Sequence, residues 1–579
     1  MKFSHRWLWL AVALRTFRSS ASETELANAD TPWRTPPSAA WTRIGALAVF
    51  SLAWFGGTDA GGAEDVGPVA WQYRVVLEAG DPQPKGKREA TAYVWLPPAS
   101  KTIRGLLVGG GEEYGTAPPV RQACVDQHLG IVMMRGYLGM FRYWTEGDRD
   151  AERLLRAIGI IAQRTGHQEL RRVPWITFGH STGGIFCRNV AYWKPDRVAG
   201  VIHYKSGNFH ARNVSPPEGA SLAGVPMLIV NGQYETYGPD AVEHPDEKDK
   251  RLDKRYGRET QWVYVRSDIQ KFRQRDPNHL MSLLLDPGGD HFFGSPELWQ
   301  QMALFIRKTA ERRIPAALPP GDEPVKCVRV TVEDGWLSDS DLKQPVHAAA
   351  PYADYAGDKA VAFWHYDRET AEAAARNNRN LANPQCLENP ECTWLDEGDG
   401  WTFRAKSDWL DALPDSYCGP LAGMKVGHSA QPFELRCRPT DPVARIGPDT
   451  FRMLRAGAAA IAAVHPGDDT YRATNRWTMQ KLPVVKGEKQ TIDFPPLPDL
   501  KPGQSAELKA TASSGLPVHF EVDYGPVVIE SGKLVVRDLP ARPQYPLECR
   551  VTAWQIGRRA GKTIESAPAV SQTFRVLAQ

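Results

Sequence analysis

A serine stands between two glycines in the run Gly179-His180-Ser181-Thr182-Gly183, which has the form G-x-S-x-G. The apolar run 175–178 comes directly before it. This pattern is typical of a sharp turn between a strand and a helix that exposes a serine hydroxyl in a strained backbone conformation. The glycines are expected because such a turn brings two backbone segments too close for a Cβ atom. Ser181 is therefore predicted to be a nucleophile that attacks a carbonyl carbon.

Apolar runs and helical patterns alternate along the chain from about residue 70 to 312. Buried strands are predicted at 105–108, 130–134, 173–178, 200–204, 226–230 and 280–285. Helices are predicted at 148–164, 183–193 and 296–312. Strands that alternate with helices favour βαβ units, so the expected fold class is α/β, with a mostly parallel sheet and helices on both faces.

This combination resembles the α/β-hydrolase family of serine esterases, whose catalytic residues follow the chain order Ser, Asp or Glu, His. The resemblance points to Glu235 as the acid, because it stands three residues after Gly232 at the end of a strand. It points to His291 as the histidine, because the run Gly289-Asp290-His291-Phe292-Phe293 follows the last strand. Asp290 is the alternative acid, although its place next to His291 in sequence is a poor one for reaching that ring.

These residue types divide the work of ester cleavage. A serine hydroxyl is a weak nucleophile at neutral pH, so His291 is expected to take its proton and later to protonate the leaving alcohol. Glu235 is expected to hold the imidazole in the productive tautomer and to stabilise the imidazolium.

The oxyanion needs two backbone N–H donors. Thr182, the residue after the nucleophile, is predicted to supply one. The other is expected in the run 108–114, whose glycine triplet resembles the Gly-rich oxyanion loop of the family and leaves Gly110 and Gly111 as alternatives. The usual leading histidine is missing there, and Glu112 and Glu113 follow.

A chain of 579 residues suggests several domains, and a net charge of +3 with both signs interspersed gives no sign of a nucleic-acid partner. The apolar runs 7–14 and 44–55 both follow basic residues and are shorter than the ~18 residues of a membrane span. The second has the parts of a secretory signal, so the mature protein is predicted to begin near Glu64. An uncleaved anchor is the alternative.

The predicted organisation is a leader at 1–63, an α/β-hydrolase catalytic domain at 64–315, a β-rich middle domain at 316–487 and an Ig-like β-sandwich at 488–579. The last part resembles the Ig-like repeats of bacterial secreted and surface proteins, some of which bind glycans. In the middle part a helix capped by Asp367 is expected. Trp394, Trp401 and Trp409 are interpreted as the core of a small β-rich domain or as a sugar-stacking platform.

Eight cysteines agree only loosely with export. The spacing allows disulfides between Cys386 and Cys392 and between Cys418 and Cys437. The other four are interpreted as buried thiols: Cys124, Cys187, Cys327 and Cys549. None has C-x-x-C spacing, so a zinc site is not expected.

The sequence thus predicts a secreted, periplasmic or cell-surface serine hydrolase that cleaves a carboxylic ester through an acyl-enzyme. No metal, nucleotide or flavin cofactor is predicted. The aromatic run 135–144 suits an aryl or sugar ester, and the short connection between the strands at 200–204 and 226–230 favours an open site for a polymeric substrate. Two alternatives stay open: a serine peptidase, and a surface binding or adhesion protein whose hydrolase-like domain is inactive, with glycan contact through its C-terminal domain.

Overall fold

The computed structural model describes residues 69–76, 91–110, 115–135, 144, 146–206, 218–233, 235, 261–289, 291, 294–413, 423–438 and 441–579. The predicted leader lies outside the described residues, as do Gly111, Glu112, Glu113 and Asp290.

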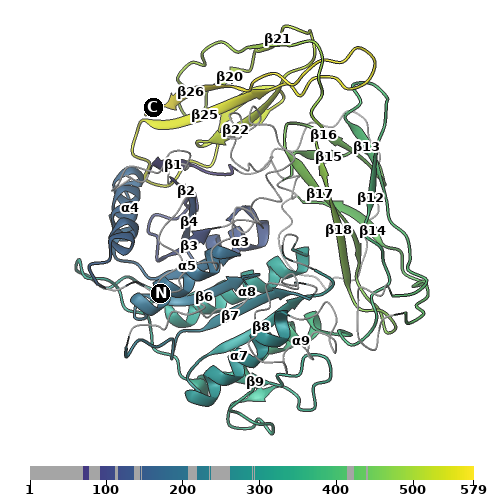
Figure 1. Ribbon diagram of the computed structural model, residues 1–579. Coiled ribbons are helices and arrows are strands. Elements are labelled where there is room, and N and C mark those ends of the chain that lie inside the picture. Colours follow the sequence, from purple (N-terminus) through teal and green to yellow (C-terminus); the bar gives the residue numbers. More distant parts are fainter. Residues whose placement is uncertain are drawn as a thin grey trace, which may run out of the picture.

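An eight-stranded sheet forms the centre of the N-terminal half, in the order β1-β2-β4-β3-β5-β6-β7-β8 (Figure 1). Its strands are β1 Tyr73–Val76, β2 Thr91–Trp95, β3 Gly105–Gly110, β4 Leu129–Arg135, β5 Trp175–His180, β6 Val198–Tyr204, β7 Met227–Gly232 and β8 Met281–Asp286. The pairs from β4 through β8 are parallel, and β2 is antiparallel to both β1 and β4. The mostly parallel sheet is therefore as expected, although β1 and β2 were not among the predicted strands.

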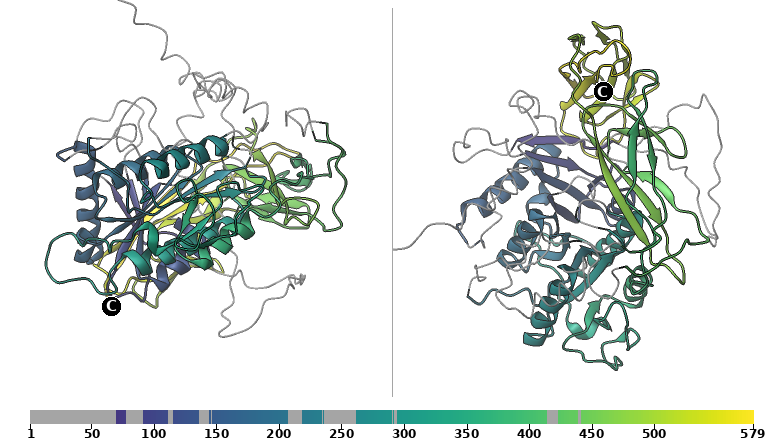
Figure 2. Two further views of the ribbon diagram at one scale, coloured as in Figure 1. Left: turned by 90° about the horizontal axis from the view of Figure 1, so that it is seen from below. Right: turned by 45° about the vertical axis from the view of Figure 1, so that its right-hand side comes forward.

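Helices cover both faces of this sheet, because its strands are apolar on both sides (Figures 1 and 2). On one face lie α4 Arg149–Thr165, α5 Thr182–Trp193 and α7 Gln261–Arg275, and on the other lie α3 Pro118–Asp126 and α8 Pro296–Arg313. The predicted bounds of helix α4 were close to the observed ones, because local signals define both of its ends. The Asp148 side chain caps its first N–H groups, and Gly166, at a φ of 75°, ends it.

The chain after α8 continues to pack against the α/β sheet. Strands β9 Trp336–Ser338, β10 Ala350–Pro351 and β11 Phe363–His365 form a small sheet, and helix α9 Arg368–Asn377 follows with the expected Asp367 cap. Both β11 and α9 contact β8. The Tyr366 hydroxyl donates to Thr309 Oγ1 of α8 at 3.0 Å. The proposed boundary at 315/316 stays a prediction, since this region is attached closely to the α/β part.

Two further sheets share one core. One has the order β12-β13-β16-β15, and the other β14-β17-β18. Their bounds are β12 Glu391–Trp394, β13 Thr402–Lys406, β14 Glu434–Cys437, β15 Val443–Arg445, β16 Thr450–Met453, β17 Ala458–His465 and β18 Thr474–Lys481. Trp401 is fully buried in this core, and Trp394 and Trp409 pack against it. Trp401 thus follows the core interpretation, while Trp394 and Trp409 are only partly buried and the sugar-stacking alternative stays a prediction for them.

The predicted Cys386–Cys392 disulfide is wrong, because both residues are free thiols. Cys386 is buried in the β-rich core, while Cys392 pairs with Ala405 within β12 and β13. Spacing along the chain carries no information about the distance between the two Cα atoms. Cys418 lies outside the described residues, so its predicted pairing with Cys437 stays a prediction.

The C-terminal strands are β19 Ile492–Asp493, β20 Ser505–Glu507, β21 Thr511–Ala512, β22 His519–Tyr524, β23 Val527–Glu530, β24 Lys533–Val536, β25 Leu547–Trp554 and β26 Val570–Val576. Two three-stranded antiparallel sheets, β20-β24-β23 and β22-β25-β26, contribute to a common core. The expected hairpin turn at Ser531 and Gly532 has φ values of 47° and 76°. These strands are compatible with an Ig-like sandwich, which stays a prediction.

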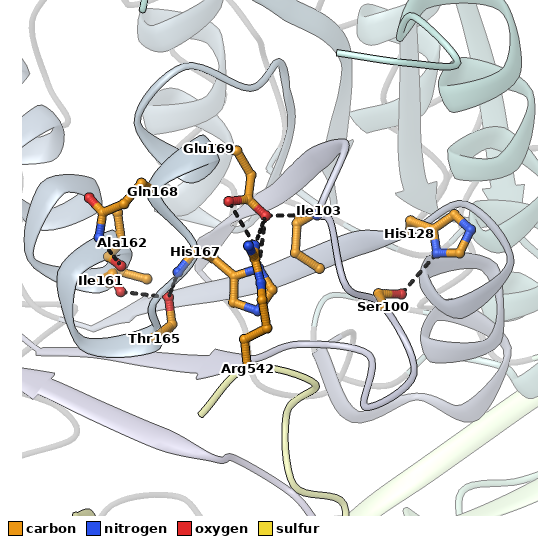
Figure 3. Close-up of polar contacts among 10 residues, drawn as sticks. All are labelled: Ser100, Ile103, His128, Ile161, Ala162, Thr165, His167, Gln168, Glu169 and Arg542. Carbon is orange, nitrogen blue, oxygen red and sulfur yellow. Dashed lines mark hydrogen bonds and ion pairs between the residues drawn. The ribbon is translucent and has the colours of Figure 1, made fainter. Parts of the chain in front are cut away.

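Figure 3 shows how this C-terminal part is attached to the α/β part. Arg542 donates to Glu169 Oε1 at 2.8 Å, and the same oxygen contacts His167 Nδ1 at 2.8 Å and accepts the Ile103 N–H at 3.1 Å. Burial raises the pKa of Glu169, but the hydrogen bonds from His167 and from backbone N–H groups outweigh it and lower the pKa to about 2. Val69 at the start of the sheet also donates its N–H to Asp538, at 3.1 Å.

Among the helices that the structure describes, none is both long and apolar enough to cross a membrane.

The Glu169 bridge predicts a pH-dependent contribution to stability. A carboxyl whose pKa is lower in the folded protein stabilises it above the unfolded pKa, and this is lost as the pH falls toward the folded value. Glu169→Gln is expected to lower Tm by a few degrees at pH 7, and the difference should shrink from pH 4.5 toward pH 2. Calorimetry measures both. The control is Glu152→Gln, which removes an exposed partner of Arg156, with an expected change of about 1 °C or less. Equal Tm values for wild type and Glu169→Gln at pH 7 would contradict the prediction.

Candidate active site

Ser181 occupies a sharp turn between the end of β5 and the start of α5. Its φ of 56° and ψ of −125° lie outside the regions that a residue with a side chain adopts easily. Gly179 makes the turn possible, because a Cβ there would lie 2.0 Å from the Gly183 carbonyl oxygen. Gly183 is less constrained. A Cβ on it would meet its nearest neighbour, the Gly110 carbonyl oxygen, at an ordinary 3.5 Å. The expectation that both glycines are sterically required therefore holds only for the first.

Neighbouring strand ends fix the backbone of Ser181. Its N–H donates to the Tyr204 carbonyl at the end of β6, at 3.1 Å. Its own carbonyl accepts the Gly184 N–H at 3.0 Å and the Ser206 hydroxyl. These contacts stabilise a conformation that costs on the order of 1–3 kcal/mol by itself.

The structure brings the three predicted catalytic side chains together. His291 Nε2 lies 3.0 Å from Ser181 Oγ, and His291 Nδ1 lies 2.6 Å from Glu235 Oε1. Glu235 comes three residues after the end of β7, and His291 five residues after the end of β8. Strands that run parallel end at one edge of the sheet, which is why residues far apart in sequence meet here.

The environment of Glu235 keeps its carboxylate oriented. The side chain is 3% exposed, and its second oxygen accepts the Gly232 N–H at 3.0 Å and the Asn231 amide at 3.2 Å. Since a carboxylate can only accept, Nδ1 of His291 must carry the proton. Nε2 of the neutral ring then has its lone pair directed at the serine hydroxyl, as a general base requires.

The loop that carries His291 is fixed at its start by side chains from other strands. Asp286 at the end of β8 forms an ion pair with Lys205 at 2.7 Å, and both side chains are fully buried. Asp286 also accepts the Ser295 N–H at 3.4 Å. One residue after β7, Gln233 accepts the Gly288 N–H at 2.9 Å. Sequence reasoning missed these residues. The available signal was their type, since each is a polar residue at or just after the end of an apolar run.

Two of the three predicted oxyanion residues are described. Thr182 is the first residue of α5, so its N–H is among those that have no carbonyl partner within the helix. Gly110 ends β3 and lies beside Gly179 in the parallel register. Gly110 is therefore close to the turn at Ser181, the serine elbow, which is consistent with its predicted role. Gly111 lies outside the described residues. The assignment of the oxyanion donors stays a prediction.

The β-rich region contacts both loops that carry the site. A Cβ on Gly288 would lie 2.6 Å from the Asn475 nitrogen, at the start of β18. The Leu381 carbonyl accepts hydrogen bonds from Gln233 at 3.5 Å and from the buried Arg472 at 3.3 Å. Figures 1 and 2 show β17 and β18 beside the carboxyl ends of the parallel strands. The loops of Glu235 and His291 are therefore packed against residues 381–475.

Among the described residues, no group of three or more His, Cys, Asp and Glu side chains is arranged to hold a metal ion.

The sheet order, the antiparallel β2 and the serine elbow after β5 together have the arrangement of the α/β-hydrolase fold. Neither a protein-family model nor a curated protein sequence matches the chain.

Solved structures do match. Fluorophosphonate-binding serine hydrolase F of Staphylococcus aureus is 16% identical, with a TM-score of 0.26, over 42% of this chain and 99% of that one. The poly(3-hydroxybutyrate) depolymerase LpqC of Bordetella parapertussis is 19% identical, with a TM-score of 0.28, over 42% and 92%. Est1E of Butyrivibrio proteoclasticus is 13% identical, with a TM-score of 0.24, over 40% and 98%. Likenesses this distant carry no weight for function, which must be argued from the site.

The contact of Gly288 with β18 generates a prediction. Gly288 has a φ of 67°, so Gly288→Ala adds backbone strain as well as a clash with the Asn475 nitrogen. We expect a Tm lowered by several degrees and a slower reaction of Ser181 with a fluorophosphonate. The control is Gly515→Ala, at a φ of 73° with open space around it, which adds strain of about 1 kcal/mol without a clash. Equal reaction rates for the two variants would show that the contact does not support the site.

Proposed function

We propose that this chain is a serine hydrolase that cleaves a carboxylic ester through an acyl-enzyme, with Ser181, His291 and Glu235 as its catalytic triad. One observation carries the proposal: a continuous hydrogen-bonded series runs from Ser181 Oγ through both nitrogens of His291 to Glu235, with distances of 3.0 and 2.6 Å. A binding protein descended from an enzyme has no need of this alignment. Secretion, proposed from residues 1–63, is part of the same hypothesis.

The reaction follows from the positions of the protons. His291 Nε2 takes the proton of the Ser181 hydroxyl while Oγ forms a bond to the ester carbonyl carbon. The negative charge that develops on the carbonyl oxygen is stabilised by the Thr182 N–H and by that of Gly110 or Gly111. When the tetrahedral intermediate collapses, the bond to the alcohol oxygen breaks and His291 donates the proton to it. A water molecule, deprotonated by His291, then hydrolyses the acyl-enzyme.

Glu235 acts through the imidazole. Its carboxylate accepts the Nδ1–H, which keeps the lone pair on Nε2, and it stabilises the imidazolium formed after proton transfer. The donors from Gly232 and Asn231 hold the carboxylate in place, so the acid needs no rearrangement during the reaction.

Labelling with a fluorophosphonate, read by intact mass, tests for an activated serine without knowledge of the substrate. We expect one adduct in the wild type and none in Ser181→Ala. The control is Ser429→Ala, because Ser429 also follows a Gly-His pair but donates to Asp468 at 2.5 Å in the β-rich region; this variant should be labelled like the wild type. No adduct in well-folded wild-type protein would instead favour the binding-protein alternative. A screen of ester and peptide substrates then separates an esterase from a peptidase.

Glu235→Gln is expected to lower kcat for 4-nitrophenyl acetate by about 10²- to 10⁴-fold, with a smaller effect on KM. The Glu235 carboxylate is surrounded by three donors, from Gly232, Asn231 and His291. An amide must turn its own NH₂ group either toward His291 or toward Gly232 and Asn231 together. If that group faces His291, the ring takes the other tautomer and Nε2 loses its lone pair. Glu152→Gln is the control for a change of charge alone, and a loss below about 10-fold in Glu235→Gln would contradict this role.

A further inference from the structure

We propose that His180, the residue before the nucleophile, is a positioning residue for His291. It would act through the backbone carbonyl of His291 and not through the reacting atoms. The expected effect on rate rests on the proposed hydrolase function, whereas the effect on geometry does not.

The contact itself is well formed. His180 Nε2 lies 2.8 Å from the His291 carbonyl oxygen, and the two rings lie side by side with centroids 5.1 Å apart. A carbonyl oxygen can only accept, so Nε2 of His180 carries the proton and donates. The His180 ring also contacts Tyr204, with centroids 5.2 Å apart. Two neighbouring rings thus limit the rotation of the donor away from the carbonyl.

Burial, together with the neighbouring His291, lowers the pKa of the His180 imidazole to about 4. The ring is therefore neutral at physiological pH. A neutral donor next to His291 can position the backbone without opposing the positive charge that the His291 ring acquires during the reaction.

The chain before His291 explains why such an anchor is needed. The sequence Pro287-Gly288-Gly289 leads to the histidine, and two consecutive glycines give the backbone more freedom than any other pair of residues. Gln233 fixes this segment at the Gly288 N–H, and the Lys205–Asp286 ion pair fixes its start. Beyond Gly289, the hydrogen bond from His180 holds the backbone carbonyl of His291 itself.

The contact also links the position of the base to that of the nucleophile. His180 is the last residue of β5, and Ser181 follows it at once. The segment that sets the position of the nucleophile therefore also sets the position of its base. A displacement of the elbow would carry the His291 carbonyl with it, so the distance between Ser181 Oγ and His291 Nε2 is protected against small movements of the loop.

The test compares three substitutions that differ in where they place a donor. His180→Gln puts an amide N–H near the position of Nε2, while His180→Asn has the same group but reaches only to the position of Nδ1. His180→Phe keeps a ring against Tyr204 and removes the donor. We measure kcat and KM for 4-nitrophenyl acetate, the rate constant of fluorophosphonate labelling, and Tm.

We expect His180→Phe and His180→Asn to lower kcat and the labelling rate by about 10- to 100-fold, because a displacement of about 1 Å has effects of this size. KM should change little, and His180→Gln should remain within about threefold of the wild type. The control is His279→Phe. His279 lies just before the amino end of β8, far along the strand from the site, and its Nδ1 contacts the Asp276 carbonyl at 3.0 Å. This variant should lower Tm and leave kcat unchanged. Equal losses in the Gln and Phe variants would assign His180 a merely structural role.

Crystal structures of the wild type and of His180→Phe decide the geometry even if the wild type proves inactive. Movement of the His291 carbonyl, with the distance from Nε2 to Ser181 Oγ increased beyond about 3.5 Å, supports the inference. An unchanged His291 in the variant overturns it, whatever the outcome of the labelling experiment for the proposed function.

Discussion

The close approach of two backbone segments at the nucleophile is the constraint from which the geometry of the site follows. Gly179 passes so near to Gly183 that a Cβ on it would lie 2.0 Å from a carbonyl oxygen. At this close approach Ser181 has a φ of 56°. The strained conformation is stabilised by the packing of β5 against α5 and by the hydrogen bond that the Ser181 N–H donates to Tyr204 at the end of β6. Every other part of the site is arranged around this one turn.

Two buried carboxylates support the loops of the site, and their surroundings differ. Asp286 is paired with Lys205, so its charge is neutralised within the interior. Glu235 has no cation beside it among its described contacts, only N–H donors and His291. A buried charge needs compensation, and Glu235 finds it in the N–H donors around it. This difference supports the proposed role of Glu235, and not Asp286, as the acid of the triad.

The sequence allowed the parts of the site that depend on local pattern to be predicted. Apolar runs located strands β3 to β8, and the caps at Asp148 and Asp367 located two helices. Ser181 could be named from its turn motif, and Glu235 and His291 from the resemblance to the α/β-hydrolase family, which expects these residues after the ends of strands.

The rest depended on tertiary contacts. The bond from His180 to His291 and the ion pair of Lys205 with Asp286 join residues 81 to 111 positions apart. The pattern of apolar residues does not predict such contacts, because they depend on the order of the strands in the sheet. Most strands of residues 336–481 have five residues or fewer, so their pattern was too weak to assign.

The edge of the central sheet at β8 has a consequence for the solution behaviour of the chain. Strand β8, with the sequence MSLLLD, is the last strand of the order and pairs only with β7 within the described sheet. An apolar edge of this kind is a template for pairing with other molecules. Here β11 and α9 cover it, and the Asn377 side chain donates to the Leu285 carbonyl. Residues 350–377 thus cover this edge, and a fragment trimmed at residue 315 would leave it exposed to pairing with other molecules.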